Sequence, residues 1–84
     1  MRLARDKATG AYVWARGIAS IRLRNLGECW RWHVDVGDLR RHDTQPTYDA
    51  ARKVAVQVVV GELERLAAEG RKAEDALAAL RGAP

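Results

Sequence analysis

The segment IASIRLRNLGECWRWHVDV, residues 18–36, decides the fold. Apolar and polar residues alternate through it on both sides of the Asn-Leu-Gly-Glu sequence at residues 25–28. Alternation with a period of two is typical of a β-strand that buries one face, and Asn and Gly favour turns. The segment therefore predicts two antiparallel strands joined by a tight loop.

The strand faces follow from parity, because a slip of one residue would turn every side chain to the opposite face. We expect an even-length loop centred on Leu26 and Gly27, which places apolar residues opposite apolar ones. The expected pairs are Leu23 with Trp30, Ile21 with Trp32, Ala19 with Val34, Arg22 with Arg31 and Ser20 with His33. Two arginines directly opposite each other are destabilising, and such a pair indicates an anion outside the chain.

A second turn is expected at Gly37-Asp38, because glycine at the first central position suits a type II′ hairpin. The chain would return as a third, short and polar edge strand over residues 39–43. Residues 11–16, an apolar and aromatic stretch between two glycines, are expected to form a further short strand. The pairs expected in the second hairpin are Val36 with Leu39 and Asp35 with Arg40.

After Pro46 the apolar period changes to 3.6, which predicts helix. Thr47 suits the N-cap and Asp49 suits the first turn, so a long helix is expected over about residues 47–69. A short Ala-rich helix is expected over about residues 72–81. The helical pattern of the long segment consists of Ala51, Val54, Ala55, Val58, Glu62, Leu63 and Leu66.

The chain has 84 residues, of which 48% are hydrophobic, and it is expected to form one small domain over residues 1–84. The predicted fold class is α+β. It consists of a three- or four-stranded antiparallel sheet within residues 11–43, packed on one long α-helix and followed by a short C-terminal helix. The valine-rich run at residues 54–60, from Val54 to Val60, is apolar around most of the helix. It therefore needs a second partner, either the C-terminal helix or a second subunit in a homodimer.

No apolar run of the length that a membrane span needs is present, and residues 1–7 have no apolar run after their charges. A single cysteine, Cys29, excludes an internal disulfide framework and a cysteine-rich zinc site. These features predict a cytoplasmic protein with no membrane contact.

The formal net charge is +4, and its distribution along the chain is uneven. Residues 1–42 contain nine Lys or Arg against four Asp or Glu, whereas residues 43–84 contain six against seven. The excess is almost entirely arginine, which suits bidentate contacts to phosphate or carboxylate. The alternative is a solvated strand face in an arginine-rich composition. The candidate binding residues are Arg22, Arg24, Arg31, His33 and Arg40.

No catalytic constellation stands out. His33 and His42 should be neighbours across the second hairpin, but they lack the further ligands that a metal site needs. Cys29 lies about 13 Å from His33 along a strand, too far for a nucleophilic pair. Trp30 could serve as a base-stacking platform, but alternation favours a place in the core. We therefore predict no enzyme activity, no metal and no cofactor.

Residues 21–66 resemble the layout of the AP2-like arm-binding domain of phage-type integrases. The matching pieces are Trp30-Arg31-Trp32, Arg40-Arg41 and the helix start Thr47-Tyr48-Asp49-Ala50-Ala51. The resemblance implies that the outer face of the sheet enters the DNA groove. This chain departs from the pattern in having few lysines and in having Asp35 on the proposed contact face.

In size and architecture the chain also resembles the small accessory proteins of phages and mobile elements, among them anti-CRISPR proteins. This resemblance implies a non-enzymatic, stoichiometric inhibitor of a nuclease complex that acts in the cytoplasm of a host bacterial cell. The partner would then be a protein complex that handles nucleic acid. The alternative is a small DNA-binding module that contacts nucleic acid directly through the basic outer face. A structural dimerisation module is a further alternative.

Overall fold

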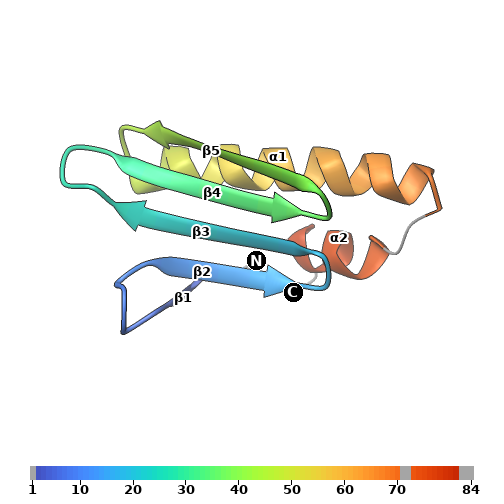
Figure 1. Ribbon diagram of the computed structural model, residues 1–84, viewed down its shortest axis with the longest axis horizontal. Helices are drawn as coiled ribbons and strands as arrows, with labels where there is room; N and C mark the ends of the chain where they lie inside the picture. Colours follow the sequence, from blue (N-terminus) through green and yellow to red (C-terminus); the bar gives the residue numbers. More distant parts are fainter. Residues whose placement is uncertain (1, 71–72, 82–84) are drawn as a thin grey trace.

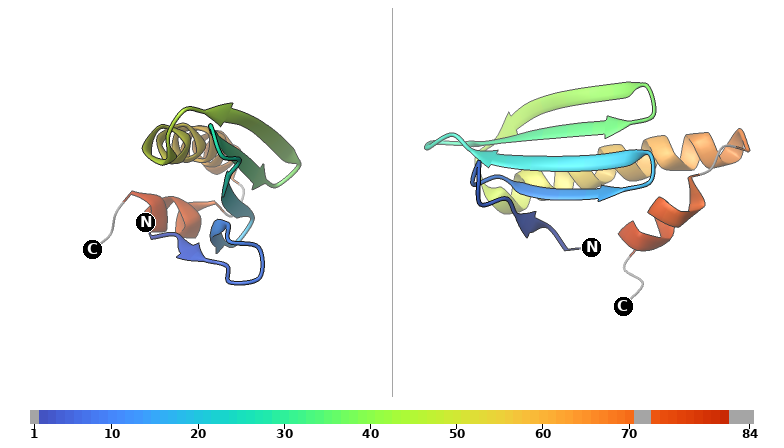
Figure 2. Two further views of the ribbon diagram at one scale, coloured as in Figure 1. Left: turned by 90° about the vertical axis from the view of Figure 1, so that its left-hand side faces the viewer. Right: turned by 60° about the horizontal axis from the view of Figure 1, so that its bottom comes forward.

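The computed structural model describes residues 2–70 and 73–81, which form a five-stranded antiparallel sheet and two helices. The strands pair in the order of the sequence, and both helices lie on one face of the sheet (Figures 1 and 2). Within the described residues, no helix or strand covers the other face (Figure 2). The elements are β1 (Ala4–Arg5), β2 (Tyr12–Arg16), β3 (Ala19–Asn25), β4 (Trp30–Val36), β5 (Leu39–Gln45), α1 (Tyr48–Ala68) and α2 (Glu74–Leu80).

The predicted α+β class is confirmed, but the sheet has five strands rather than three or four. The additional strand is β1, which has two residues and pairs with β2. The last strand, β5, continues to Gln45, two residues beyond the predicted end. Of the predicted short helix, residue 72 lies outside the described residues, and the observed α2 begins at Glu74. None of the described helices combines the length and the hydropathy that crossing a bilayer requires.

The hairpin of β3 and β4 has the predicted faces but a different register. The observed pairs are Ala19 with Val36, Ile21 with Val34, Leu23 with Trp32, Arg22 with His33, Arg24 with Arg31 and Asn25 with Trp30. The strands are therefore displaced by two residues from the predicted pairing. A displacement of two keeps every side chain on its own face, so the prediction of the buried set holds although the pairs are wrong.

The loop between β3 and β4 explains this displacement. Asn25 accepts a hydrogen bond at its Oδ1 from the backbone N–H of Gly27 at 2.8 Å. The backbone N–H of Leu26 donates to the carbonyl oxygen of Cys29 at 2.8 Å, and Gly27 has a φ of 100°. A left-handed backbone at this point favours glycine. The loop is therefore centred one residue later than expected, between Gly27 and Glu28.

The hairpin of β4 and β5 has the predicted register, with Val36 opposite Leu39 and Asp35 opposite Arg40. Gly37 has a φ of 56°, and no described residue other than glycine has a positive φ. This combination is that of the predicted type II′ turn.

Helix α1 begins where the sequence predicts. The Oγ1 atom of Thr47 accepts a hydrogen bond from the backbone N–H of Ala50 at 3.1 Å, which caps the first turn. The predicted inward positions Val54, Val58 and Glu62 are only half-buried. The residues that α1 buries are Ala51, Ala55, Val59, Leu63 and Leu66. This line begins with two alanines, so the first half of the helix can lie close to the sheet.

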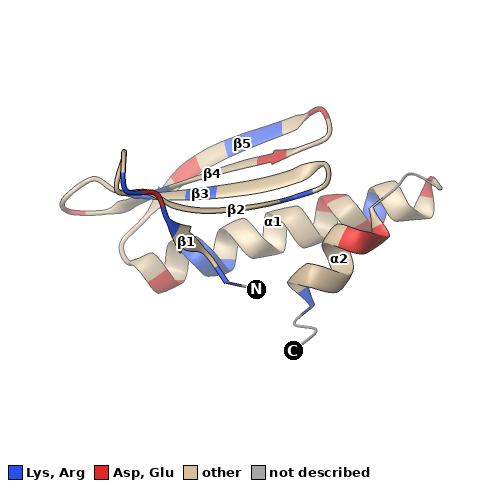
Figure 3. Cartoon of the chain, turned by 90° about the horizontal axis from the view of Figure 1, so that it is seen from below, with Lys and Arg blue, Asp and Glu red and all other residues tan. Residues whose placement is uncertain are grey.

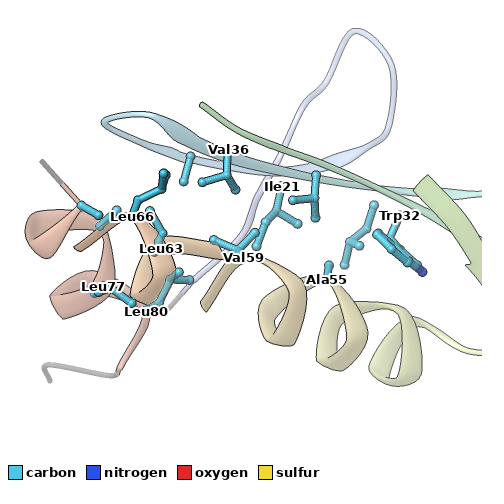
Figure 4. Packing of buried hydrophobic residues seen from close by; sticks show 14 of the residues in the cluster. Ile21, Trp32, Val36, Ala55, Val59, Leu63, Leu66, Leu77 and Leu80 are labelled. Atoms are coloured by element: carbon cyan, nitrogen blue, oxygen red, sulfur yellow. The ribbon is translucent and has the colours of Figure 1, made fainter. Parts of the chain in front are cut away.

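The core lies between the sheet and the two helices (Figure 4). Trp32 occupies one end of it near Ala55, and Leu77 and Leu80 of α2 close the other end near Leu63. Helix α2 therefore packs against part of α1, but most of the valine-rich run that was expected to need a partner stays half-buried. The remaining half-buried valines of α1 are Val54, Val56, Val58 and Val60.

An aromatic cluster joins the start of α1 to the sheet. The ring centroids of Trp30 and Tyr48 are 5.1 Å apart, and those of Tyr12 and Tyr48 are 5.2 Å apart, both in edge-to-face arrangements.

An ion pair joins the last residue of β2 to α2. Arg16 of β2 forms a bidentate pair with Asp75 of α2, with nitrogen–oxygen distances of 2.9 and 3.1 Å. This pair lowers the pKa of the Asp75 carboxyl through a hydrogen bond and the guanidinium charge.

Candidate functional site

The uncovered face of the sheet carries all five residues that the sequence singles out. Four of them alternate with buried neighbours on β3 and β4, so their side chains project away from the helices. The fifth, Arg40 of β5, lies opposite Asp35 of β4 and shares its face. All five are exposed, and Figure 3 shows Lys and Arg along β2, β3 and β5. We call this set the basic face: Arg22, Arg24, Arg31, His33 and Arg40.

Two arginines face each other directly on the basic face. They are Arg24 and Arg31 rather than the predicted Arg22 and Arg31, because of the displacement in register. Within residues 2–70 and 73–81, none of these three side chains forms an ion pair. The fold therefore holds two like charges side by side at the loop end of β3 and β4 without neutralising either of them.

Arg40 is in a different electrostatic environment. Its Nε lies 3.5 Å from Oδ1 of Asp35, the residue opposite it across β4 and β5. Both side chains are more than half exposed, so the pair contributes little to stability. The pair does reduce the positive charge at this end of the basic face, which is therefore most basic around Arg24 and Arg31.

A stacked histidine pair lies between these two ends. The rings of His33 and His42 have centroids 5.3 Å apart and an interplanar angle of 26°. Partial burial lowers the pKa of His33, and the positive charges of His42, Arg31 and Arg22 lower it further. The carboxylate of Asp35 opposes this shift. At neutral pH the ring of His33 is therefore uncharged and can both donate and accept a hydrogen bond.

The free energy of unfolding is expected to decrease as the pH falls below 6.5, the ordinary pKa of the imidazole. Because the pKa of His33 is lower in the folded chain, the unfolded chain binds the proton first and is stabilised by it. The folded chain therefore has its full stability above the pKa that His33 has in the unfolded chain. It loses part of this stability as the pH falls from there through the pKa that His33 has in the folded chain. Urea unfolding of the parent and of His33→Gln between about pH 7 and about pH 5 measures this effect. The variant should lose less stability over this range, and an equal loss in both proteins would contradict the assignment.

A hollow in this face lies beside the basic residues and brings in positions that the sequence analysis missed. It is formed where β2 and the turn before it meet β3 and β4. Two of its lining side chains, Ala15 and Ser20, are small and lie opposite each other on β2 and β3, next to the Arg22 and His33 pair. The residues that line it are Asp6, Val13, Trp14, Ala15, Ser20, Ile21, Arg22, His33 and Asp35. The strand itself was predicted over residues 11–16, but no residue pattern in the sequence predicts that it pairs with β3 or that the turn with Asp6 lies beside it.

The described residues bring together no three His, Cys, Asp or Glu side chains in an arrangement that could hold a metal ion. Cys29 lies half-buried in the loop before β4. No family model, no curated protein and no solved structure matches this chain. The geometry of the basic face is therefore the main guide to function.

Proposed function

We propose that the protein is a non-enzymatic binding module whose basic face contacts the phosphate backbone of double-stranded DNA. The observation that carries this proposal is the opposed pair Arg24 and Arg31, exposed beside Arg22 on an uncovered sheet face and without an ion-pair partner among the described residues. A phosphate group placed between the two guanidinium groups would relieve their repulsion and accept charge-assisted hydrogen bonds from both.

The spacing of the arginines favours a polymer over a single small anion. Arg22 and Arg24 lie two residues apart on one strand, which separates their Cα atoms by about 7 Å. Arg31 lies across from Arg24 on the neighbouring strand. Three cations arranged along and across the strands can contact several phosphates of one backbone at once, which a single small anion cannot offer.

The aromatic residues favour a duplex over a single strand. Single-stranded nucleic acid binds proteins through aromatic side chains on which its bases stack. Trp30 and Trp32 lie on the helix side of β4, and Tyr12 packs with Trp30 and Tyr48. The basic face thus has no tryptophan or tyrosine on β3, β4 or β5. A pair of antiparallel strands, in contrast, fits the major groove of a duplex, where arginine can also read guanine.

One observation favours the second candidate, an inhibitor that binds a protein complex which handles nucleic acid. Asp35 projects from the same face, and its side chain is 56% exposed. A carboxylate at this position repels phosphate but can pair with a basic residue of a protein. In this case the basic face would contact a protein surface of mixed charge.

A salt series distinguishes the two candidates. Fluorescence anisotropy with a short labelled duplex of random sequence, and with one of its strands alone, gives the affinity at each salt concentration. We expect tighter binding to the duplex and a slope of log K against log salt of about −3, since each phosphate contact contributes about −0.9. Absence of duplex binding at low salt, with a protein partner retained from nuclease-treated bacterial lysate, would instead support the inhibitor.

A further inference from the structure

Strand β5 forms a long open edge of the sheet. It has seven residues and is last in the strand order, whereas the opposite edge is formed by the two residues of β1. The backbone N–H of Gly37 donates to the carbonyl oxygen of Ile18 on the β3 side at 3.1 Å. Because hydrogen-bonding directions alternate along a strand, the adjacent Val36 bonds to Leu39 of β5. The residues of β5 whose backbone groups point out of the edge are therefore Arg40, His42 and Thr44.

The helix side of β5 carries two opposite charges that have no ion-pair partner within the described ranges. Arg41 lies opposite Val34, and Asp43 lies opposite Trp32, so each has an apolar cross-strand neighbour. Both are exposed. The carboxylate of Asp43 accepts a hydrogen bond from the backbone N–H of Thr44 at 2.8 Å. Charges on an edge strand normally prevent pairing with another strand.

We propose that β5 pairs antiparallel with β5 of a second copy of this chain, about a two-fold axis at His42. The outward backbone groups can pair in three central registers. Placing Arg40 opposite His42 brings two copies of Arg41 together, and placing His42 opposite Thr44 brings two copies of Asp43 together. Only the register with His42 opposite His42 places Arg41 of each copy opposite Asp43 of the other. Like charges thus disfavour the two neighbouring registers. In the register centred on His42, the two-fold axis gives two favourable pairs between Arg41 and Asp43.

The surface beneath the edge supports a second copy as the occupant. Leu39 and Arg41 share a groove with half-buried Val54 and Val58 of α1, and Gln57, Gly61 and Glu62 complete its lining. A pair between Arg41 and Asp43 of the second copy would extend over this groove and cover the two valines. The arrangement would also account for part of the valine-rich run that α2 leaves half-buried.

The dimer would join two five-stranded sheets into one continuous sheet, with both basic faces on the same side. This inference depends on the edge of the sheet and not on the ligand of the basic face. Charge changes at β5 therefore test the dimer, and charge changes at β3 test the proposed function.

Sedimentation equilibrium tests the dimer by a charge swap. We expect the parent to have twice the chain mass of 9.4 kDa. Arg41→Asp and Asp43→Arg should each weaken self-association about tenfold or more, because each places like charges opposite each other across the interface. The double variant should restore the dimer, and a mixture of the two single variants should form a heterodimer. Circular dichroism checks that each variant folds.

The matched control is Arg22→Glu, a charge reversal on the basic face away from the edge, which should leave the dimer intact and weaken DNA binding. A monomeric parent would overturn the inference. So would single variants that remain fully dimeric, or a folded double variant that stays monomeric. If Arg22→Glu keeps the parent's affinity for DNA while the dimer stays intact, the proposed function fails and the dimer stands. If the parent is a monomer that binds DNA, the dimer fails and the proposed function stands.

Discussion

Trp32→Ala is expected to lower the free energy of unfolding by about 3–5 kcal/mol, the usual cost of deleting a buried aromatic side chain. Trp32 is 3% exposed and lies on the helix side of β4, opposite Leu23 of β3. Its side chain lies at one end of the core, near Ala55 (Figure 4). At about 0.05–0.15 kcal/mol per residue, a chain of this size holds roughly 4–13 kcal/mol in total. The variant should therefore be largely unfolded at 37 °C or melt far below the parent.

Trp32→Phe is the matched control. The indole Nε1 of Trp32 is buried and has no hydrogen-bond partner among the described residues, so the parent already bears the cost of an unsatisfied donor. Phenylalanine keeps most of the apolar volume and removes that donor, and its loss of stability should be well below that of alanine. Urea unfolding followed by circular dichroism compares the three proteins. A parent-like midpoint for Trp32→Ala would show that this end of the core is not packed as described.

The double charge reversal Arg24→Glu with Arg31→Glu is expected to weaken duplex binding about a hundredfold at low salt. Each charge-assisted arginine–phosphate contact is worth about 1.5–3 kcal/mol, or roughly a factor of ten or more, and both contacts are lost together. The slope of log K against log salt should become less steep by the contribution of about two phosphate contacts. The variant should still fold, because both side chains are exposed. The opposed arginines are replaced by opposed glutamates, so the repulsion between the two positions is similar.

Lys53→Glu provides the comparison for each single reversal. Lys53 is exposed on α1, on the side of the molecule away from the basic face, and its reversal changes the net charge by the same amount. It should alter duplex binding far less than Arg24→Glu or Arg31→Glu does. Equal losses from all three single variants would indicate a general effect of net charge rather than a binding face.

The alternation of residues 18–36 was sufficient to predict the buried and exposed sides of the central strands, but not the pairing. A period of two cannot distinguish registers that differ by two residues, since both place Ile21 and Trp32 on the same side. The deciding contact is the hydrogen bond from the backbone N–H of Gly27 to Asn25 Oδ1. A turn-forming Asn two residues before a glycine carries this information, whereas hydrophobicity does not.

The features that the sequence did not predict, strand β1 and the aromatic cluster, depend on contacts between segments that are distant in the chain. Strand β1 has two residues and no alternation, and it exists only because β2 lies beside it. The cluster of Tyr12, Trp30 and Tyr48 joins three elements that are far apart in the chain. The five candidate binding residues, in contrast, share one face because parity alone places them there. Their ligand stays a prediction.

The order of the elements has a consequence for synthesis of the chain. All five strands precede α1, so the whole sheet leaves the ribosome before the helix that covers it. Pairing between strands that are adjacent in sequence needs only short loops to close and is therefore fast. At about 5–20 residues per second, the 21 residues of α1 take roughly one to four seconds to be translated. During this interval the nascent sheet exposes the apolar side of Ile21, Trp32 and Val34, and it is then most susceptible to aggregation and to capture by chaperones.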